Sequence, residues 1–159
     1  GAVGSAAVQL AKHFGAHVTG VCSTVNMDLV KSLGADKVID YNKDDFTKNG
    51  EKYDVIFETV NKTSLSRNLK SLKPKGILIL SAAGMSEMIR GAWISMTNTQ
   101  KILTGVNSEN AEDMVFLKEL IEAGKLKPVI DRTYPLEQMA EAHAYVEKGH
   151  KRGNVAIVI

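Results

Sequence analysis

Short apolar runs alternate with segments of helical periodicity along most of the chain. Five apolar runs rich in β-branched side chains predict buried strands, at residues 17–22, 37–41, 53–60, 76–82 and 101–106. Apolar positions spaced three or four apart predict helices, at residues 5–14, 27–34, 64–72, 85–96 and 112–123. Strands that are apolar throughout and separated by helices are typical of a parallel sheet covered on both faces. The pattern therefore predicts an α/β fold with a doubly wound parallel sheet.

The pattern changes after Gly124. Residues 125–135 contain two prolines and are predicted to be extended, and residues 136–148 predict a last helix. The sequence NVAIVI at residues 154–159 predicts a final strand. Because this tail does not continue the alternation of strands and helices, we expect a boundary where it begins.

The opening stretch GAVGSAAVQL carries two glycines three positions apart, at the start of the first predicted helix. A dinucleotide-binding G-x-G-x-x-G turn places its second glycine where backbone approaches a pyrophosphate and its third where the helix packs closely. Gly1 and Gly4 have the spacing of those two glycines. Unpaired N–H groups at this helix start then predict phosphate binding by Gly1, Ala2, Val3 and Gly4. The first glycine and its strand would precede residue 1, so we expect a Rossmann-like sheet that lacks its first strand in this chain.

The residues after the predicted strand at 17–22 favour one form of the nicotinamide cofactor. NAD-binding domains place an acidic residue about 20 positions after the glycines, on the ribose hydroxyl groups. Here the strand runs into Cys22-Ser23-Thr24-Val25, without a carboxylate. A 2′-phosphate would meet no negative charge there, and the hydroxyl groups of Ser23 and Thr24 could donate to it. The sequence therefore favours NADPH (NADP) over NAD.

The composition of the chain excludes several classes of protein. The chain has 159 residues, 44% of them hydrophobic and 24% charged, with a formal net charge of +2, which excludes a disordered chain. It has no basic run that would bind nucleic acid, and no apolar run of the roughly 20 residues that span a membrane. No secretory leader is visible, so we expect a cytoplasmic protein. One cysteine, Cys22, and four histidines without ligand spacing predict that zinc is not bound.

Several stretches resemble the medium-chain dehydrogenase/reductase superfamily, and within it the zinc-free, quinone-oxidoreductase-like branch. They cover essentially the whole chain and read GAVGSAAVQLAKHFGAHVTGVCST, SLGADKVIDY, YDVIFETV, SLKPKGILILS and EAHAYVEKGHKRGNVAIVI. Members of this superfamily have an N-terminal catalytic domain followed by a cofactor domain. The resemblance implies that this chain is the C-terminal, cofactor-binding half. Residues 1–125 would form the truncated Rossmann domain, and residues 126–159 would return to the catalytic domain, which is absent.

The resemblance also implies further cofactor contacts. Tyr41 corresponds to a family tyrosine near the adenosine phosphate, whereas Val25 stands where relatives commonly have Lys or Arg. In the family, loops after the later strands surround the nicotinamide half, and the residues implied there are Val60, Asn61, Ala83, Gly105 and Asn107. In the last segment, Asn154 stands where relatives place a polar or basic residue against the cofactor.

Hydride transfer is the activity that the resemblance implies, between NADPH and a carbonyl or alcohol, a quinone or an enone. The nicotinamide carries this chemistry, and the family's substrate pocket lies largely in the missing domain. We assign no acid, base or nucleophile, and we expect the chain alone to be inactive. Family members commonly dimerise through the sheet edge at residues 101–106, which predicts a homodimer.

The strand order implied by the resemblance, 3-2-1-4-5-6, makes the missing strand a central one. Its loss removes ladder hydrogen bonds on both sides and several buried side chains, a large part of a stability of about 5–15 kcal/mol. We therefore expect NVAIVI to fill that position, either within the chain or swapped from a neighbour.

Three alternatives stay open on the sequence alone. The chain could be a regulatory nucleotide-binding module without a reaction, or a methyltransferase-like α/β fold that binds adenosylmethionine. It could also be an interaction module, because the Met-rich predicted helix with Trp93 lies next to the predicted edge strand in the sequence and could pair subunits.

Overall fold

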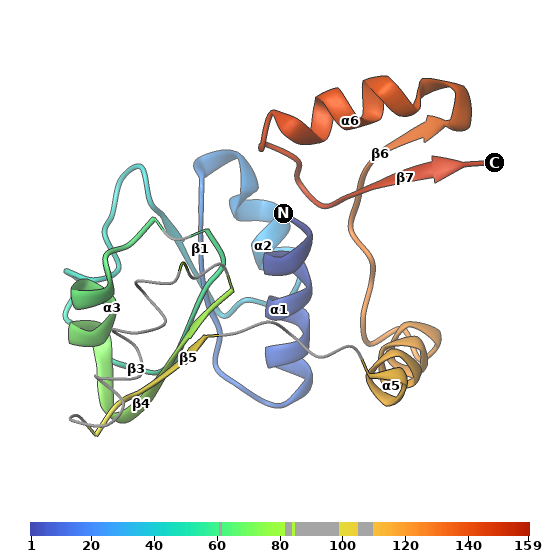
Figure 1. Cartoon of the computed structure of the whole chain (residues 1–159). Helices are drawn as coiled ribbons and strands as arrows, with labels where there is room; N and C mark the ends of the chain where they lie inside the picture. The colour runs from blue at the N-terminus through green and yellow to red at the C-terminus, as the bar shows by residue number, and fades with distance from the viewer. Residues whose placement is uncertain (61, 82–83, 85–98, 105–109) are drawn as a thin grey trace. The chain divides into compact units, whose positions relative to one another are not determined.

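The computed structural model describes residues 1–60, 62–81, 84, 99–104 and 110–159 (Figure 1). It divides into two compact units, one formed by Gly1–Asn42 with Asn110–Ile159 and the other by Lys43–Glu109. The elements are α1 (Ala2–His13), β1 (Thr19–Cys22), η1 (Thr24–Asn26), α2 (Met27–Ser32), β2 (Lys37–Asp40), β3 (Tyr53–Glu58), α3 (Leu65–Ser71), β4 (Leu72–Leu80), β5 (Lys101–Thr104), α5 (Ala111–Glu122), β6 (Ile130–Pro135), η2 (Leu136–Gln138), α6 (Met139–Glu147) and β7 (Asn154–Val158).

The first unit contains two parallel strand pairs, β1 with β2 and β6 with β7. Helix α2 packs on β1 and β2, and α6 packs on β6 and β7. The contact between β1 and α2 is close, because a methyl group at Gly20 would lie only 2.4 Å from Cγ1 of Val30. Glycine at position 20 therefore lets the helix approach the strand.

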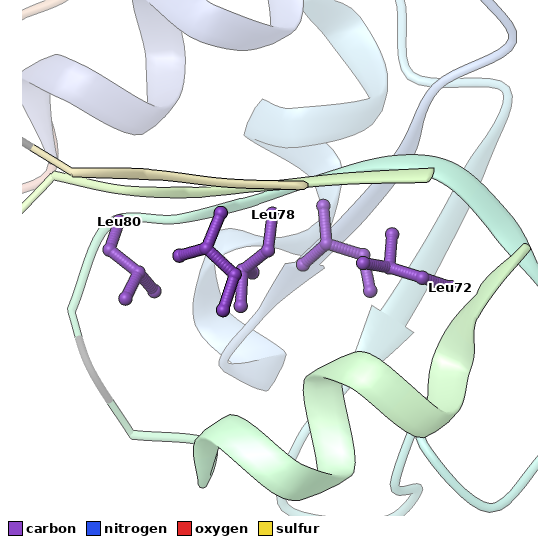
Figure 2. Close-up of a cluster of buried hydrophobic side chains, with 5 residues drawn as sticks. Leu72, Leu78 and Leu80 are labelled. Atoms are coloured by element: carbon purple, nitrogen blue, oxygen red, sulfur yellow. The ribbon is translucent and has the colours of Figure 1, made fainter. Parts of the chain in front are cut away.

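The second unit is built on the parallel sheet β3–β4–β5. Its core contains Leu72, Leu78 and Leu80 from β4 together with Ile56 and Ile102 from the neighbouring strands. Leu65 and Leu69 of α3 pack against this cluster, and Figure 2 shows the labelled leucines between the sheet and α3. Burial of these apolar side chains supplies the main favourable free energy of this unit.

The alternation of helices with parallel strands confirms the predicted α/β class. The pairings β2–β1 and β3–β4–β5 also reproduce two portions of the implied strand order, 3-2 and 4-5-6. Most predicted elements form within a few residues of their expected bounds, and the helix predicted at residues 85–96 lies outside the described residues.

The start of β4 differs from the prediction, which extends a helix through residue 72 and begins the strand at residue 76. In the structure β4 already begins at Leu72, and its register against β3 shifts between Tyr53 and Val55. Pro74 has no N–H group to donate to a ladder, and Lys75 beside it has a φ of 65°. An irregularity of the strand accommodates both residues, so the Pro and Gly that suggest a loop stand inside a strand.

The expectation that NVAIVI fills the central position of the sheet is wrong for the single chain. The segment forms β7, which pairs in parallel with β6 in a two-stranded sheet. The physical reason is proximity along the sequence, since α6 links β6 to β7 as one β-α-β unit and only a short loop has to close. The exchange of this strand with a neighbouring molecule stays a prediction.

Asn68 of α3 is fully buried, and within the part of the chain that the structure describes neither its side-chain oxygen nor its nitrogen has a hydrogen-bond partner. An unsatisfied buried polar group costs about 1–3 kcal/mol. We expect Asn68→Leu, which replaces the amide by an apolar group of similar length, to raise the free energy of unfolding by about 1 kcal/mol. Urea denaturation of both proteins measures the difference. A lower stability of the Leu variant, close to that of Asn68→Ala, would show that the amide is satisfied in solution.

Candidate functional site

Helix α1 begins with free backbone donors at the predicted phosphate-binding turn. Gly1 is the N-cap, and its carbonyl accepts the first helical hydrogen bond from the Ser5 N–H at 3.1 Å. No side chain caps this end within the described residues, and the first turn has no acidic residue. The N–H groups of Ala2, Val3 and Gly4 have no acceptor in the helix, so they can donate to an anion.

The two glycines of this turn have different surroundings. A methyl group at Gly1 would lie 3.7 Å from the carbonyl oxygen of Lys151, and one at Gly4 would meet no atom of the described chain within 4 Å. The close packing that the glycine motif assigns to Gly4 is therefore not seen here. Because neither glycine has a side chain, the backbone at both positions is uncovered, and a ligand can approach it closely.

Gln9 fixes α1 to the C-terminal part of the same unit. Its side chain is buried, and its Nε2 donates to the carbonyl oxygens of Ser5 and Lys127 at 3.1 and 3.0 Å. Its Oε1 accepts from the Lys127 N–H at 2.8 Å. A cavity of about 180 Å³ lies between these elements, lined by residues that include Ala2, Gln9 and Asn154. Residues from both ends of the sequence therefore form one small pocket beside the start of α1.

The loop after β1 brings Ser23, Asn26 and Arg152 together. Asn26 donates from Nδ2 to the Ser23 hydroxyl oxygen at 3.1 Å, and its Oδ1 accepts from Nε of Arg152 at 2.9 Å. A second nitrogen of the same guanidinium donates to the Val25 carbonyl oxygen. Arg152, from the loop before β7, therefore places a positive charge directly on the loop that follows β1.

Asp40, at the end of β2, engages the other predicted hydroxyl group. Its buried carboxylate accepts from the Thr24 hydroxyl at 2.5 Å and from the backbone and side-chain nitrogens of Asn42, each at 3.0 Å. A threonine hydroxyl has one hydrogen, so this bond leaves Ser23 as the hydroxyl donor on the loop. The pKa of the nearby Cys22 thiol is raised, first by burial and then by the Asp40 charge, which keeps the thiol neutral.

Asp131 of β6 fixes the backbone of the segment that carries Arg152. Its Oδ2 accepts from the Tyr145 hydroxyl at 2.6 Å and from the Arg152 N–H at 2.9 Å. The pKa of the Asp131 carboxyl is held below its usual value, chiefly by the hydrogen bond from Tyr145 and next by the one from Arg152. The guanidinium of Arg132 lies 4.1 Å from the centre of the Tyr145 ring, a cation–π contact. The backbone at residue 152 is therefore held by a charged group fixed between β6 and α6.

The predicted site residues fall into three groups. Gly1, Ala2, Val3, Gly4, Ser23, Thr24, Tyr41 and Asn154 belong to the first unit, Val60 belongs to the second, and Asn61, Ala83, Gly105 and Asn107 lie outside the described residues. Tyr41 is 61% exposed and donates its backbone N–H to the Cys22 carbonyl at 3.0 Å, next to the loop after β1. Asn154 donates from Nδ2 to the Val129 carbonyl at 3.1 Å.

Sequence reasoning missed Asn26, Asp40 and Arg152. The one available signal for Arg152 was the Lys-Arg-Gly triplet before the last strand, and Asp40 belongs to the KVIDY stretch already noted. In the described part of the chain, no group of three or more His, Cys, Asp or Glu side chains could hold a metal ion. None of the helices searched is long and apolar enough to cross a membrane.

Comparisons with known proteins place the chain among oxidoreductases. Residues 33–157 match the family described as zinc-binding dehydrogenase. The chloroplastic quinone-oxidoreductase QR1 of Triphysaria versicolor is 36% identical, over 99% of this chain and 49% of its own length. The chloroplastic NADPH-dependent alkenal/one oxidoreductase of Arabidopsis thaliana is 33% identical, over 99% of this chain and 38% of its own length.

A solved structure agrees with these matches. The quinone oxidoreductase from Coxiella burnetii superposes with a TM-score of 0.86 at 25% identity, over 99% of this chain and 50% of that protein. The chain therefore spans about half the length, or less, of the relatives it matches. The predicted Rossmann-like fold is confirmed by this superposition.

Proposed function

This chain belongs to the medium-chain dehydrogenase/reductase superfamily, as the cofactor-binding half of a quinone-oxidoreductase-like member, and from that premise we propose that it binds NADPH. The observation that carries the proposal is the start of α1, where three N–H groups are free and the first turn has no acid. Such a helix start matches the charge and donor needs of a bridging pyrophosphate. Gly1 and Gly4 leave the backbone uncovered for it.

The loop after β1 supports the phosphorylated form of the dinucleotide. It offers a half-buried Ser23 hydroxyl and the Arg152 guanidinium, and the carboxylate of Asp40, which accepts from the Thr24 hydroxyl of this loop, is buried. An acid aimed at the ribose would favour NAD instead. One relative, the alkenal/one oxidoreductase of Arabidopsis thaliana, is named as NADPH-dependent. The preference for NADPH over NADH is part of this proposal.

In the protein that contains this chain, we propose hydride transfer between NADPH and a quinone, an enone or another carbonyl compound. The named activities of the relatives support this range of substrates. The bound nicotinamide would supply the hydride chemistry. This chain's own residues would bind and orient the cofactor: α1 at the pyrophosphate, and Ser23 with Tyr41 at the adenosine end. Zinc independence stays a prediction.

Titration of the chain with NADPH and NADH, followed by backbone amide NMR signals, tests the proposal. We expect NADPH to shift the signals of Ala2, Val3 and Gly4 at the start of α1, because their N–H groups would change from water to phosphate oxygens. Adenosylmethionine, titrated in parallel, is the matched control for a methyltransferase-like site. Unchanged amide signals with both dinucleotides would contradict the proposed function.

A non-catalytic role in subunit pairing is the second candidate. Among the described residues β5 is one of the two edge strands of the β3–β4–β5 sheet, and its Leu103 is 50% exposed. An exposed edge with an apolar side chain can pair with a second copy of the chain. Sedimentation of the chain with and without NADPH separates the two roles, because an interaction module would dimerise without responding to the dinucleotide.

A further inference from the structure

The guanidinium of Arg152 is the cationic group fixed on the loop after β1. Its Nε donates to Asn26 Oδ1 at 2.9 Å, and another nitrogen donates to the Val25 carbonyl oxygen. Within the described residues neither bond goes to a carboxylate, and Arg152 is exposed. An arginine has five N–H donors, so several remain for a second acceptor. The guanidinium is thus held in place by neutral oxygen atoms, and Asp131, which accepts from the Arg152 backbone N–H, is an acidic neighbour that interacts with it electrostatically.

The position of this charge matches one part of a dinucleotide. In Rossmann-like domains the loop after the strand that follows the glycine-rich helix meets the adenosine ribose, where an acid selects a 2′-hydroxyl and a nearby Arg accommodates a 2′-phosphate. β1 is that strand here, and Ser23 begins the loop. Val25 itself brings no charge, and Arg152 reaches the same backbone from 127 positions away.

Arg152 is fixed both at its guanidinium and at its backbone, and its neighbour Lys151 lies beside the start of α1. Asn26 joins the guanidinium to Ser23, because its amide oxygen accepts from Arg152 while its amide nitrogen donates to the Ser23 hydroxyl. The backbone of Arg152 is held by Asp131 at 2.9 Å. Its neighbour Lys151 has its carbonyl oxygen 3.7 Å from a methyl position on Gly1. The C-terminal segment therefore runs from the start of α1 to the loop after β1, as a bound dinucleotide would.

We propose that Arg152 is the specificity-determining residue of this chain, which pairs with the 2′-phosphate of NADPH beside Ser23 and is positioned by Asn26. This inference rests on the proposed function and names the group that selects the phosphorylated cofactor. A guanidinium and a phosphate form bidentate, charge-assisted hydrogen bonds, which a 2′-hydroxyl cannot replace. The C-terminal segment, predicted from its resemblance to serve a catalytic domain, then also contributes to the cofactor site.

The test compares the affinities of two dinucleotides for Arg152→Gln and the unmodified chain, by isothermal titration calorimetry. Hydrogen bonds to charged groups contribute about 1.5–3 kcal/mol, so Arg152→Gln is expected to weaken NADPH binding by roughly 10- to 150-fold. Binding of NADH is expected to change by less than about twofold, because NADH has no 2′-phosphate. Arg152→Lys retains the charge without the planar fork and should recover part of the NADPH affinity.

Two further variants separate positioning from charge. Asn26→Ala removes the contact that orients the guanidinium, and it is expected to weaken NADPH while leaving NADH unchanged. Lys125→Gln removes one positive charge from an exposed residue of the same unit and should alter neither affinity. The same comparison can be made with 2′,5′-ADP and 5′-ADP, which represent the adenosine half of NADPH and NADH. Arg152→Gln should lower the affinity for 2′,5′-ADP and leave the affinity for 5′-ADP unchanged.

Each outcome decides the proposal. Unchanged NADPH affinity in Arg152→Gln overturns it, and so does an equal loss of NADPH and NADH, which would give Arg152 a structural or pyrophosphate role. These failures appear only when the unmodified chain binds dinucleotide. Failure of the unmodified chain to bind either dinucleotide instead overturns the proposed function and, with it, this inference. Thermal melting of Arg152→Gln confirms that the exposed substitution leaves the fold intact.

Discussion

Leu78→Ala is expected to lower the free energy of unfolding by about 3–5 kcal/mol, because it removes a side chain from the centre of the hydrophobic cluster in the second unit. Leu78 has no exposed surface, and it lies on the central strand of β3–β4–β5 among Ile56, Leu80 and Ile102. A packed interior cannot collapse fully around a missing isobutyl group, so the loss includes a cavity as well as the transfer of apolar atoms. Whole domains are stabilised by only about 5–15 kcal/mol, which makes this loss a large fraction of the total.

Guanidinium denaturation measures the loss, and amide hydrogen exchange locates it. Protection should fall in β3, β4 and β5, since all three strands surround the substituted side chain. Leu103→Ala is the matched control: the residue follows Ile102 on β5, is half exposed, and should lose less than about 1 kcal/mol. Equal losses for the two variants would mean that the cluster around Leu78 is not the core of this unit.

The class of the fold could be predicted because its signal is local. Runs of apolar, β-branched residues fix strands, and periodic apolar positions fix helices, without knowledge of any partner. The parallel pairing of β1 with β2 and of β3 with β4 follows from the helices between them, α2 and α3. The pairing of β7 could not be read in this way. Its apolar sequence suits any open strand position, and the short connection through α6 decides that β6 is the partner.

In the candidate site, too, the local features could be predicted from the sequence and the long-range contacts could not. The glycine spacing at Gly1 and Gly4 and the hydroxyl groups after β1 are local patterns, and the sequence indicates both. The bond between Thr24 and Asp40 joins residues 16 positions apart, and the bond between Arg152 and Asn26 joins residues 126 apart. No spacing rule connects such pairs, because the first depends on β1 and β2 ending side by side and the second on the loop before β7 meeting the loop after β1. Position 25 is a valine, so the positive charge on this loop comes from Arg152, a residue distant in the sequence.

The segment that carries Arg152 depends on Gly153. A methyl group at position 153 would lie 2.5 Å from the Val129 carbonyl oxygen and 2.8 Å from Cγ1 of the same residue. That carbonyl also accepts from the backbone and side-chain nitrogens of Asn154, at 2.7 and 3.1 Å. Moving it aside would therefore break the contacts that start the β6–β7 pairing. The φ of Gly153 is not in the left-handed region, so crowding alone demands glycine here.

Gly153→Ala is accordingly expected to lower the free energy of unfolding by about 2–4 kcal/mol, from overpacking against backbone and the loss of the Asn154 hydrogen bonds. Gly149→Ala is the matched control in the same segment. Its methyl group would meet nothing within 4 Å, and only its φ of 74° resists the substitution, at a cost of about 1 kcal/mol. Urea denaturation of the two variants measures both values.

The same variant tests whether the C-terminal segment serves the cofactor. Displacement of residue 153 shifts Arg152 and Asn154 together. Gly153→Ala should therefore weaken NADPH binding even at temperatures at which the variant is fully folded, whereas Gly149→Ala should not. Because Arg152 faces the 2′-phosphate, the loss should be larger for NADPH than for NADH. Full NADPH affinity in a destabilised Gly153→Ala protein would separate the packing of β7 from cofactor recognition. The segment would then hold the strand pair together without contributing to the site.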